Sequence, residues 1–474
     1  MRIFLLGVCM FLLGISMSSC DTTDVSEENG DSGNQDTGVT TLPDDATTWA
    51  AQYVGGLAEE MEDVIVTSAG GYLVTGTMED YDTDEVHVWL AKYSDDGEID
   101  WQKAYGGDGI DTGYKARETS DGGFIVAGAT ESFSNGSSDI WVFKIDSAGG
   151  IEWQKSYGGS GVEQAWSIDI TTDGGYIVAG GTSSFGAGGA DCLVLKLDAN
   201  GNIVWQKAFG GSADEAGGGE FEEYVARVFE DGDGNYLVSC ITFSFGSGDS
   251  DIWVFKLDAD GSILWENAYG DEDEDGMWMI REKSDGGYLV PGYFTPTSDY
   301  DTDLWAMHLN KDGTIAWQNT YGVSGVWDEA LTLGATSDGG ALLGGFYEED
   351  NDSDWSLTLV RVDTDGNLQW SSKYERGFDW ANAVAEFPGG GFAVAGATMN
   401  SLSDQVDFLM LNMSAEGTIG SSCNLLKNLE VSKKSTSVTP VATQATVTDT
   451  NITPQNTSAT VKNTENTAKY ACSG

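Results

Sequence analysis

Basic residues are scarce in this chain. Its 474 residues include 22 Lys and Arg against 77 Asp and Glu, which gives a formal net charge of −55. A protein that binds nucleic acid needs a basic face to neutralise phosphates, and these cations are too few to build a large one, so nucleic acid is excluded as a natural partner. Histidine is limited to His87 and His308, so neither a His-rich metal site nor Ser-His or Cys-His catalysis is expected.

Proline is also rare, with 6 residues, whereas glycine is abundant, with 64. Aromatic residues make up 11% of the chain. This balance is typical of an all-β protein with many tight turns between short aromatic strands. The region that carries the internal repeats has no helical periodicity.

The first 20 residues predict a secretory signal peptide. Arg2 precedes an apolar stretch from Ile3 to Ile15, which is too short for a membrane-spanning helix. Small residues then lead to Cys20, as in a bacterial lipobox, where the Cys is lipidated. The pattern predicts an exported lipoprotein, periplasmic or at the cell surface, that touches the membrane through its lipid anchor alone; the alternative is an ordinary cleaved signal. Residues 21–45 are acidic and polar, and predict a disordered tether.

Residues 46–420 contain an internal repeat of about 52 residues. A Trp marks each of seven units, and a Ser/Thr-Asp-Gly-Gly turn lies midway between successive Trp residues in most of them. The recurring tryptophans are Trp49, Trp101, Trp153, Trp205, Trp265, Trp317 and Trp370. Each unit contains four aromatic or β-branched runs separated by turns, which predicts a seven-bladed β-propeller with four antiparallel strands per blade. An elongated solenoid is the alternative.

The count of strands favours a closed ring. Trp49 lies in an outer strand with no inner strands before it, and the last inner set, residues 379–413, has no Trp-bearing strand after it. The first outer strand and the last set of inner strands form one complete blade if residues 47–53 lie beside Phe408–Asn412. This closure would remove exposed sheet edges.

The repeat resembles a known family. The pattern TSDGGYIVAG…WVxKLDxxGxIxWQKxYGG is similar to the tandem repeats of exported bacterial and archaeal β-propellers, and distantly similar to quinoprotein-like propellers. The resemblance implies the fold and export, but no particular chemistry. Quinoprotein enzymes typically have eight blades and often an adjacent Cys pair, which this chain lacks, so no quinone cofactor is expected.

Two recurring residues are interpreted as structural. We expect each recurring Trp to pack one blade against the next. A basic residue also recurs at one strand position of the repeat, and the fifth unit has His308 there instead. These basic residues are Lys92, Lys144, Lys196, Lys256 and Arg361.

Three acidic loops have the alternating spacing of Ca²⁺ ligands, and hard cations prefer several carboxylate oxygens. Their residues are Asp80, Asp82 and Asp84 in the first loop, Asp299, Asp301 and Asp303 in the second, and Asp350, Asp352 and Asp354 in the third. None of the loops continues as an EF-hand, and independent acidic loops are the alternative. No other cofactor is predicted.

A second acidic feature is predicted on the rim of the ring. The run Asp271, Glu272, Asp273, Glu274 and Asp275 and the insertion 213–223 follow corresponding outer strands. Loops at such a rim could bind a partner, or could be solvated charge that aids solubility.

The cysteines divide by position. Cys423 and Cys472 bracket a Ser/Thr/Asn-rich extension, residues 421–474, and predict a disulfide in an exported protein. The extension could form extended strands or a polar stalk. Cys192 and Cys240 fall in core strands and are expected to be buried thiols.

These observations favour a non-catalytic propeller in the cell envelope that acts as a binding or scaffold platform for a protein or a glycan. The alternative is an extracellular polysaccharide hydrolase or lyase that uses rim carboxylates as acid and base. No carboxylate pair can be singled out from the sequence, so no catalytic residue is assigned.

Overall fold

The computed structural model describes most of the chain from residue 49 onwards. The described ranges are 49–54, 58–80, 85–215, 226–247, 249–283, 286–295, 302–323, 325–349, 354–374, 378–387, 390–400, 405–419, 426–429, 431–436, 438–439, 441–443, 445–449, 455–456, 460–463 and 467–473. All regular elements within these ranges are strands, and none of the described residues belongs to a helix that could cross a membrane.

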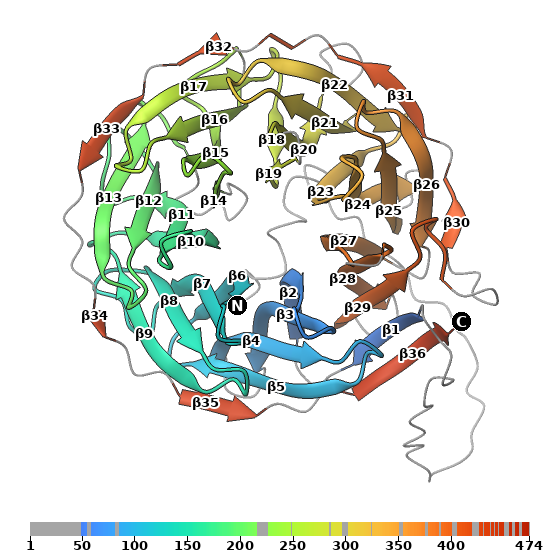
Figure 1. The fold of residues 1–474 in the computed structure, drawn as a ribbon, viewed down its shortest axis with the longest axis horizontal. Helices are drawn as coiled ribbons and strands as arrows, with labels where there is room; N and C mark the ends of the chain where they lie inside the picture. The colour runs from blue at the N-terminus through green and yellow to red at the C-terminus, as the bar shows by residue number, and fades with distance from the viewer. Residues whose placement is uncertain are drawn as a thin grey trace, which may run out of the picture.

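Seven antiparallel sheets stand around a central axis (Figure 1), which confirms the predicted seven-bladed propeller. We number the blades in chain order and give their strands from the centre outwards. Blade 1 consists of β2 (Ala58–Val66), β3 (Tyr72–Asp80), β4 (Glu85–Tyr93) and β5 (Ile99–Gly106). Blade 2 consists of β6 (Asp111–Glu118), β7 (Phe124–Thr130), β8 (Asp139–Ile145) and β9 (Ile151–Tyr157). Blade 3 consists of β10 (Glu163–Ile170), β11 (Tyr176–Thr182), β12 (Asp191–Leu197) and β13 (Ile203–Gly210).

The remaining blades follow the same plan. Blade 4 consists of β14 (Arg227–Glu230), β15 (Tyr236–Thr242), β16 (Asp251–Leu257) and β17 (Ile263–Tyr269). Blade 5 has a divided inner strand, β18 (Asp275–Met277) and β19 (Arg281–Glu282), followed by β20 (Tyr288–Phe294), β21 (Asp303–Leu309) and β22 (Ile315–Gly322). Blade 6 consists of β23 (Asp328–Ala335), β24 (Ala341–Glu349), β25 (Asp354–Val362) and β26 (Leu368–Tyr374). Blade 7 consists of β27 (Phe378–Glu386), β28 (Phe392–Asn400), β29 (Gln405–Met413) and β1 (Trp49–Val54).

The strand β1 closes the ring. It pairs antiparallel with β29, so that Trp49 lies opposite Asn412 and Tyr53 lies opposite Phe408. The first strand of the chain therefore completes the last blade, as the strand count predicts, and an open solenoid is excluded.

Local sequence explains the blades. In blade 2 every residue of β7 and β8 is buried, which matches their continuous apolar runs. The turn before β7 places Gly122 at a φ of 79°, a conformation that L side chains rarely adopt. The repeated Ser/Thr-Asp-Gly-Gly motif is thus the hairpin between the inner and second strands.

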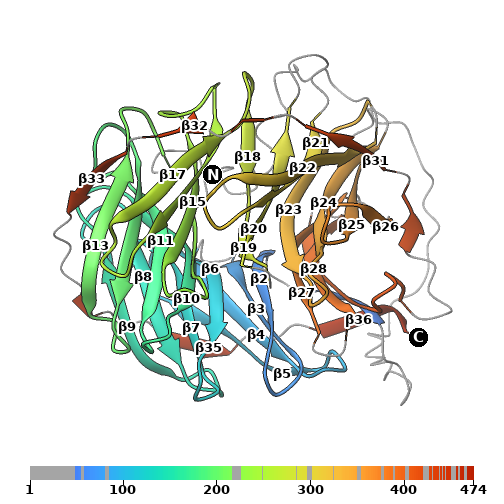
Figure 2. The same ribbon diagram turned by 45° about the horizontal axis from the view of Figure 1, so that its top comes forward.

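The C-terminal extension forms a belt of short strands around the outside of the ring (Figure 2). Each belt strand pairs with the outer strand of one blade, and the belt passes the blades in reverse chain order from blade 6 to blade 1 before it reaches β1 of blade 7. Its strands are β30 (Leu426–Asn428), β31 (Ser432–Ser435), β32 (Val441–Ala442), β33 (Thr446–Asp449), β34 (Gln455–Asn456), β35 (Thr460–Asn463) and β36 (Thr467–Ser473). The extension is thus extended strands rather than a stalk, and it covers outer edges that would otherwise be unpaired.

Each blade is joined to the next by the recurring Trp. Trp205 of blade 3 donates its indole N–H to the carbonyl of Ala259 in blade 4, at 2.9 Å. Its ring lies on Gly261, where a Cβ would come within 3.1 Å of the indole. Trp153, Trp265, Trp317 and Trp370 pack in the same way on Gly201, Gly313, Gly366 and Gly417. The predicted structural role of the Trp is confirmed.

The recurring base is structural as well. Lys256 lies 2.6 Å from Asp231, and Arg361 lies 2.7 Å from Asp338, so the base ties the third strand to the Asp of the hairpin turn in its own blade. His308 has instead the edge of its ring towards Trp317, with ring centroids 5.9 Å apart.

Removal of one indole should destabilise the ring. We expect Trp205→Ala to lower the free energy of unfolding by about 2–3 kcal/mol, less than for a fully buried aromatic side chain because Trp205 is only half-buried. The adjacent Val204 is 60% exposed, so Val204→Ala should change the same quantity by less than about 0.5 kcal/mol. Chemical denaturation of both variants checks this; equal effects would contradict the blade-joining role.

Removal of the belt should weaken the propeller without abolishing it. A chain that ends at residue 425 keeps all four strands of every blade, but the outer edges of the sheets become exposed. We expect a fall of at least about 5 °C in melting temperature and concentration-dependent self-association through the freed edges. Thermal melting and size-exclusion chromatography at several concentrations measure both. An unchanged melting temperature would show that the belt contributes no stability.

Candidate functional site

The sequence-predicted metal and anchor residues lie mainly outside the described residues. The predicted signal peptide and tether lie outside the described residues. So do Cys20, Cys423, Asp82, Asp84, Asp299 and Asp301. Of the remainder, Asp80 ends β3, Cys472 belongs to β36, and Asp303 begins β21, 3.4 Å from Lys434 of the belt. In the part of the chain that the structure describes, no three His, Cys, Asp or Glu side chains gather as metal ligands. The Ca²⁺ site and the disulfide thus stay predictions, whereas Cys192 and Cys240 are buried free thiols.

The acidic run 271–275 connects β17 with β18. Asp275 is fully buried, and its carboxylate accepts a hydrogen bond of 2.7 Å from the backbone N–H of Asp271. The carboxylate of Asp271 in turn accepts one of 3.0 Å from the N–H of Asp273. The run therefore builds a turn, and its last carboxylate faces the protein interior rather than a partner.

Asp275 belongs to a set of buried carboxyl pairs between blades, which the sequence did not reveal. In each pair, an acidic residue that begins or precedes an inner strand meets an Asp that begins the third strand of the preceding blade. Pairs of this kind are Asp139 with Glu163, Asp191 with Glu215, Asp251 with Asp275, and Asp303 with Asp328. A glycine lies between the two carboxyls: a Cβ on Gly210 would collide with both Asp191 and Glu215.

These pairs perturb the acidity of their members. Burial is the main cause that raises the pKa of Asp139 to about 6 and that of Asp191 to about 7, and the partner Glu163 or Glu215 raises it further. Burial likewise raises the pKa of Asp275 to about 8. One carboxylate oxygen of Asp139 and one of Asp191 have no hydrogen-bond partner among the described residues. Carboxyls of this kind keep their proton to a higher pH than an exposed Asp does.

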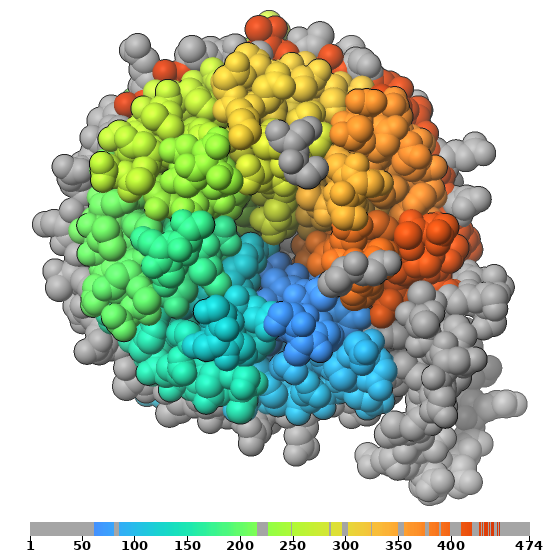
Figure 3. All heavy atoms as spheres, in the orientation of Figure 1, coloured from blue at the N-terminus to red at the C-terminus, as the bar shows by residue number. Residues whose placement is uncertain are grey.

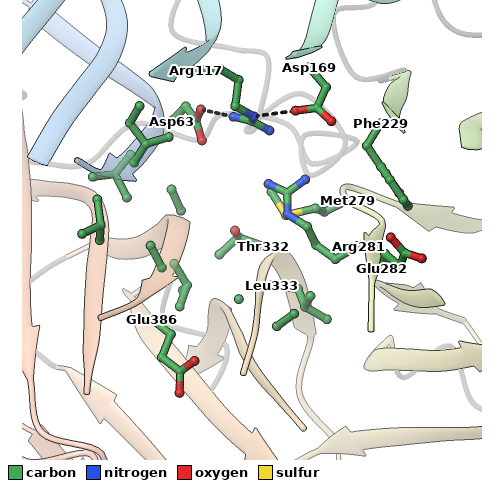
Figure 4. A pocket seen from close by; sticks show the side chains of 18 residues that line it. Asp63, Arg117, Asp169, Phe229, Met279, Arg281, Glu282, Thr332, Leu333 and Glu386 are labelled. Carbon is green, nitrogen blue, oxygen red and sulfur yellow. Dashed lines mark hydrogen bonds and ion pairs between the residues drawn. The ribbon is translucent and has the colours of Figure 1, made fainter. Parts of the chain in front are cut away.

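The central channel holds the most varied chemistry of the molecule. The seven blades surround a central depression (Figure 3), and a cavity of about 480 Å³ lies among the ends of their inner strands (Figure 4). Its walls combine charged groups with apolar ones. The residues that line it include Asp63, Arg117, Asp169, Phe229, Met279, Arg281, Glu282, Leu333, Ala335 and Glu386.

Two charged networks cross the channel. Arg117 of blade 2 lies 3.3 Å from Asp63 of blade 1 and 3.4 Å from Asp169 of blade 3. Lys115 lies 2.6 Å from the other oxygen of Asp63. Burial, only partly offset by Asp63, lowers the pKa of Lys115 to about 7. Arg227 of blade 4 donates to the backbone carbonyls of Trp166 and Trp278 in the two neighbouring blades, at 2.6 and 2.7 Å.

Arg281 differs from these cations. Its guanidinium makes one long hydrogen bond of 3.4 Å, to the carbonyl of Ile280, and forms no ion pair with any carboxylate of the described residues. Figure 4 shows it pointing into the cavity on the side of Arg117. Burial and the neighbouring charge of Arg117 lower the pKa of Arg281 to about 10, so the side chain remains charged at neutral pH.

Two glutamates at the cavity hold the fold. Glu282 accepts hydrogen bonds of 3.2 and 3.1 Å from the N–H of Gly232 in the preceding blade. Glu386 accepts one of 2.7 Å from the N–H of Ser337. Both carboxylates thus fix a neighbouring hairpin turn. Asp63 is buried and paired with Lys115 and Arg117, so the acidic side chain that is left to face a ligand is chiefly Asp169, which is partly exposed.

The channel residues occupy equivalent positions in the seven repeats. One position, set by pairing with the second strand, holds Ile65, Arg117, Asp169, Phe229, Arg281, Gly334 and Ala385. The residue at this position changes in nearly every copy, whereas the Trp, Gly and Asp residues of the repeat are kept. This contrast indicates a binding site in the channel. Sequence reasoning missed it because it weighed the residues that recur rather than those that do not.

Comparisons with known proteins were made for the whole chain. No protein-family model and no curated protein sequence matches it. Among solved structures, it is similar to Sqt1 of Chaetomium thermophilum, with 12% identity over 74% of this chain and 83% of that one, and a TM-score of 0.40. It is similar to the polysaccharide lyase Uly1, with 12% identity over 75% and 90% of the two chains and a TM-score of 0.40. An endo-1,5-alpha-L-arabinanase of Thermotoga petrophila has 13% identity over 77% and 99%, with a TM-score of 0.30.

The buried carboxyl pairs predict a stability that falls as the pH rises. The pKa values of Asp139, Asp191 and Asp275 in the folded protein lie above the unfolded value of about 4, so the stabilising contribution of these three groups is complete below pH 4 and is lost as the pH passes through about 6 to 8. We expect Asp191→Asn to raise the free energy of unfolding at pH 8.5 by on the order of 1 kcal/mol and to change it little at pH 5.

Denaturation of the variant and the wild type across this pH range measures the effect. Asp95→Asn removes the same charge from an exposed turn and serves as the control. If Asp95→Asn reproduced the pH-dependent gain, general charge repulsion rather than the pair would be the cause.

Proposed function

We propose that the protein is a binding protein that takes the end of an oligosaccharide into its central cavity. The observation that carries this proposal is the set of channel positions that differ from blade to blade within an otherwise regular repeat. Structural packing explains the recurring residues, but it does not require Ile, Arg, Asp and Phe at equivalent places around one cavity. A non-catalytic platform for a glycan is the function that this arrangement supports best.

The walls of the cavity match the chemistry of a sugar. The partly exposed carboxylate of Asp169 can accept hydrogen bonds from hydroxyl groups, and the guanidinium of Arg281 can donate to them. Phe229, Met279 and Leu333 offer apolar surface to the C–H faces of a ring. A cavity of about 480 Å³ falls within the range of about 300–1,000 Å³ that is usual for ligand sites.

The proposed setting is the cell envelope. The predicted signal peptide and Cys20 support export and lipid anchoring, and a propeller held at the envelope would have glycans within reach. The polysaccharide hydrolase or lyase alternative requires carboxylates open to a substrate. Because Asp275 is buried within its turn, that residue gives the alternative no support.

Filling the cavity should abolish binding. Ala335 lies at the end of β23 on the cavity wall and is only partly buried, so Ala335→Trp should occupy the space with little effect on the fold. We expect the purified full chain to bind members of an oligosaccharide array, and the variant to bind them at least tenfold more weakly. Val204→Trp places the same side chain on the outer surface and should leave binding unchanged.

Each result decides between the functions. Binding that survives Ala335→Trp would remove the cavity from the proposal. Cleavage of a retained oligosaccharide, seen as new products by mass spectrometry, would favour the hydrolase or lyase instead.

A further inference from the structure

The four basic residues of the channel are not equivalent. Three of them have their hydrogen-bonding capacity directed at protein groups: Lys115 at Asp63, Arg117 at Asp63 and Asp169, and Arg227 at two backbone carbonyls. Arg281 has only its long contact with Ile280 and no carboxylate partner in the described part of the chain. A charged group that is partly removed from water without a partner is costly.

The position of Arg281 is fixed by its surroundings. The inner strand of blade 5 is interrupted between β18 and β19, and the residues of the gap are held by their neighbours. Trp278 accepts a hydrogen bond from Arg227 through its carbonyl and donates one of 2.5 Å through its indole to Glu329. The adjacent Glu282 is tied to Gly232 of blade 4. The backbone on both sides of Arg281 is thus anchored while its guanidinium faces the cavity (Figure 4).

We propose that Arg281 binds a sugar carboxylate, so that the recognised unit is a uronic acid at the end of a short oligosaccharide. This inference rests on the proposed function and names its ligand class. The planar fork of a guanidinium matches a carboxylate with two parallel hydrogen bonds. Asp169, which lies beside Arg117 and is partly exposed, remains for the hydroxyl groups of the same unit (Figure 4).

The charge of the whole protein limits the ligand further. A net charge of −55 repels long polyanions, an effect that is strongest at low ionic strength. One carboxylate that enters the cavity end-on meets the guanidinium of Arg281, whereas the rest of a charged polymer would lie against an acidic surface. The geometry therefore favours a terminal acidic sugar with few further charges.

The test compares acidic and neutral forms of the same sugars. Trimers of galacturonate, glucuronate, mannuronate and guluronate, each with its methyl ester as the uncharged form, are titrated into the full chain by calorimetry. We expect at least one acid to bind about tenfold or more tightly than its ester, as charge-assisted hydrogen bonds predict. Arg281→Gln should reduce this preference to less than twofold and leave the affinity for the ester nearly unchanged, and Arg281→Lys should restore part of it.

The control is Lys311→Gln, which removes the same charge from an exposed ion pair with Asp233 on the surface. It should keep the preference, and melting temperatures should show that every variant is folded. Equal affinity for acid and ester in the wild type, or a preference that survives Arg281→Gln, would overturn this inference while leaving the glycan-binding proposal intact. If no trimer of either series bound, and the oligosaccharide array were also negative, both would fall.

Discussion

The contact of an outer-strand indole with a glycine of the next blade, made by Trp153, Trp205, Trp265, Trp317 and Trp370, is the constraint on which the ring depends. Trp265 packs on Gly313, which has a φ of 80°. A Cβ on this glycine would come within 2.9 Å of the indole. Tyr269, four residues further on, donates its hydroxyl to the carbonyl of the same glycine at 2.6 Å. A turn conformation, a packing contact and a hydrogen bond thus coincide at one residue. Repetition of this joint sets the angle between blades, and β1 then closes the circle.

Because the outer layers secure the ring, the inner strands are free to vary. In the second and third strands nearly every side chain is buried, as in β11 and β12, so their sequences are confined to apolar residues and a few fixed polar ones. Most of the inner strand is buried too, but its last residues are only partly buried and reach the channel, as Arg117 of β6 and Asp169 of β10 do. This difference in constraint explains why the same repeat is regular at Trp205 and irregular at Arg117. The division between framework and site follows from the geometry of the blade.

The sequence predicted what recurs locally, and it did not predict what depends on long-range register. The spacing of Trp49 and Trp370 indicated seven blades and their closure, because each unit repeats the same local pattern. The belt was left open because a Ser/Thr/Asn-rich segment has no apolar face; its strands are determined by outer edges up to hundreds of residues away. The carboxyl pairs were not predicted for the same reason. Asp191 and Glu215 are 24 residues apart and meet only across a blade boundary, around Gly210. The acidic run 271–275 was noticed for its charge, although its last member is part of this buried set.

The cations of the channel connect neighbouring blades near the axis of the ring, as the tryptophans connect them at its outer edge. Arg117 connects blade 2 to blades 1 and 3, and Arg227 connects blade 4 to blades 3 and 5. Desolvation of these groups is offset by carboxylates or carbonyls of the neighbouring blades, which gives each of them a structural reason to be there. Arg281 is buried in the same region at a similar cost, yet it connects no two blades among the described residues. In a chain with 22 basic residues against 77 acidic ones, a guanidinium at the axis that has no ion-pair partner in the part of the chain that the structure describes is best explained by a partner that comes from outside.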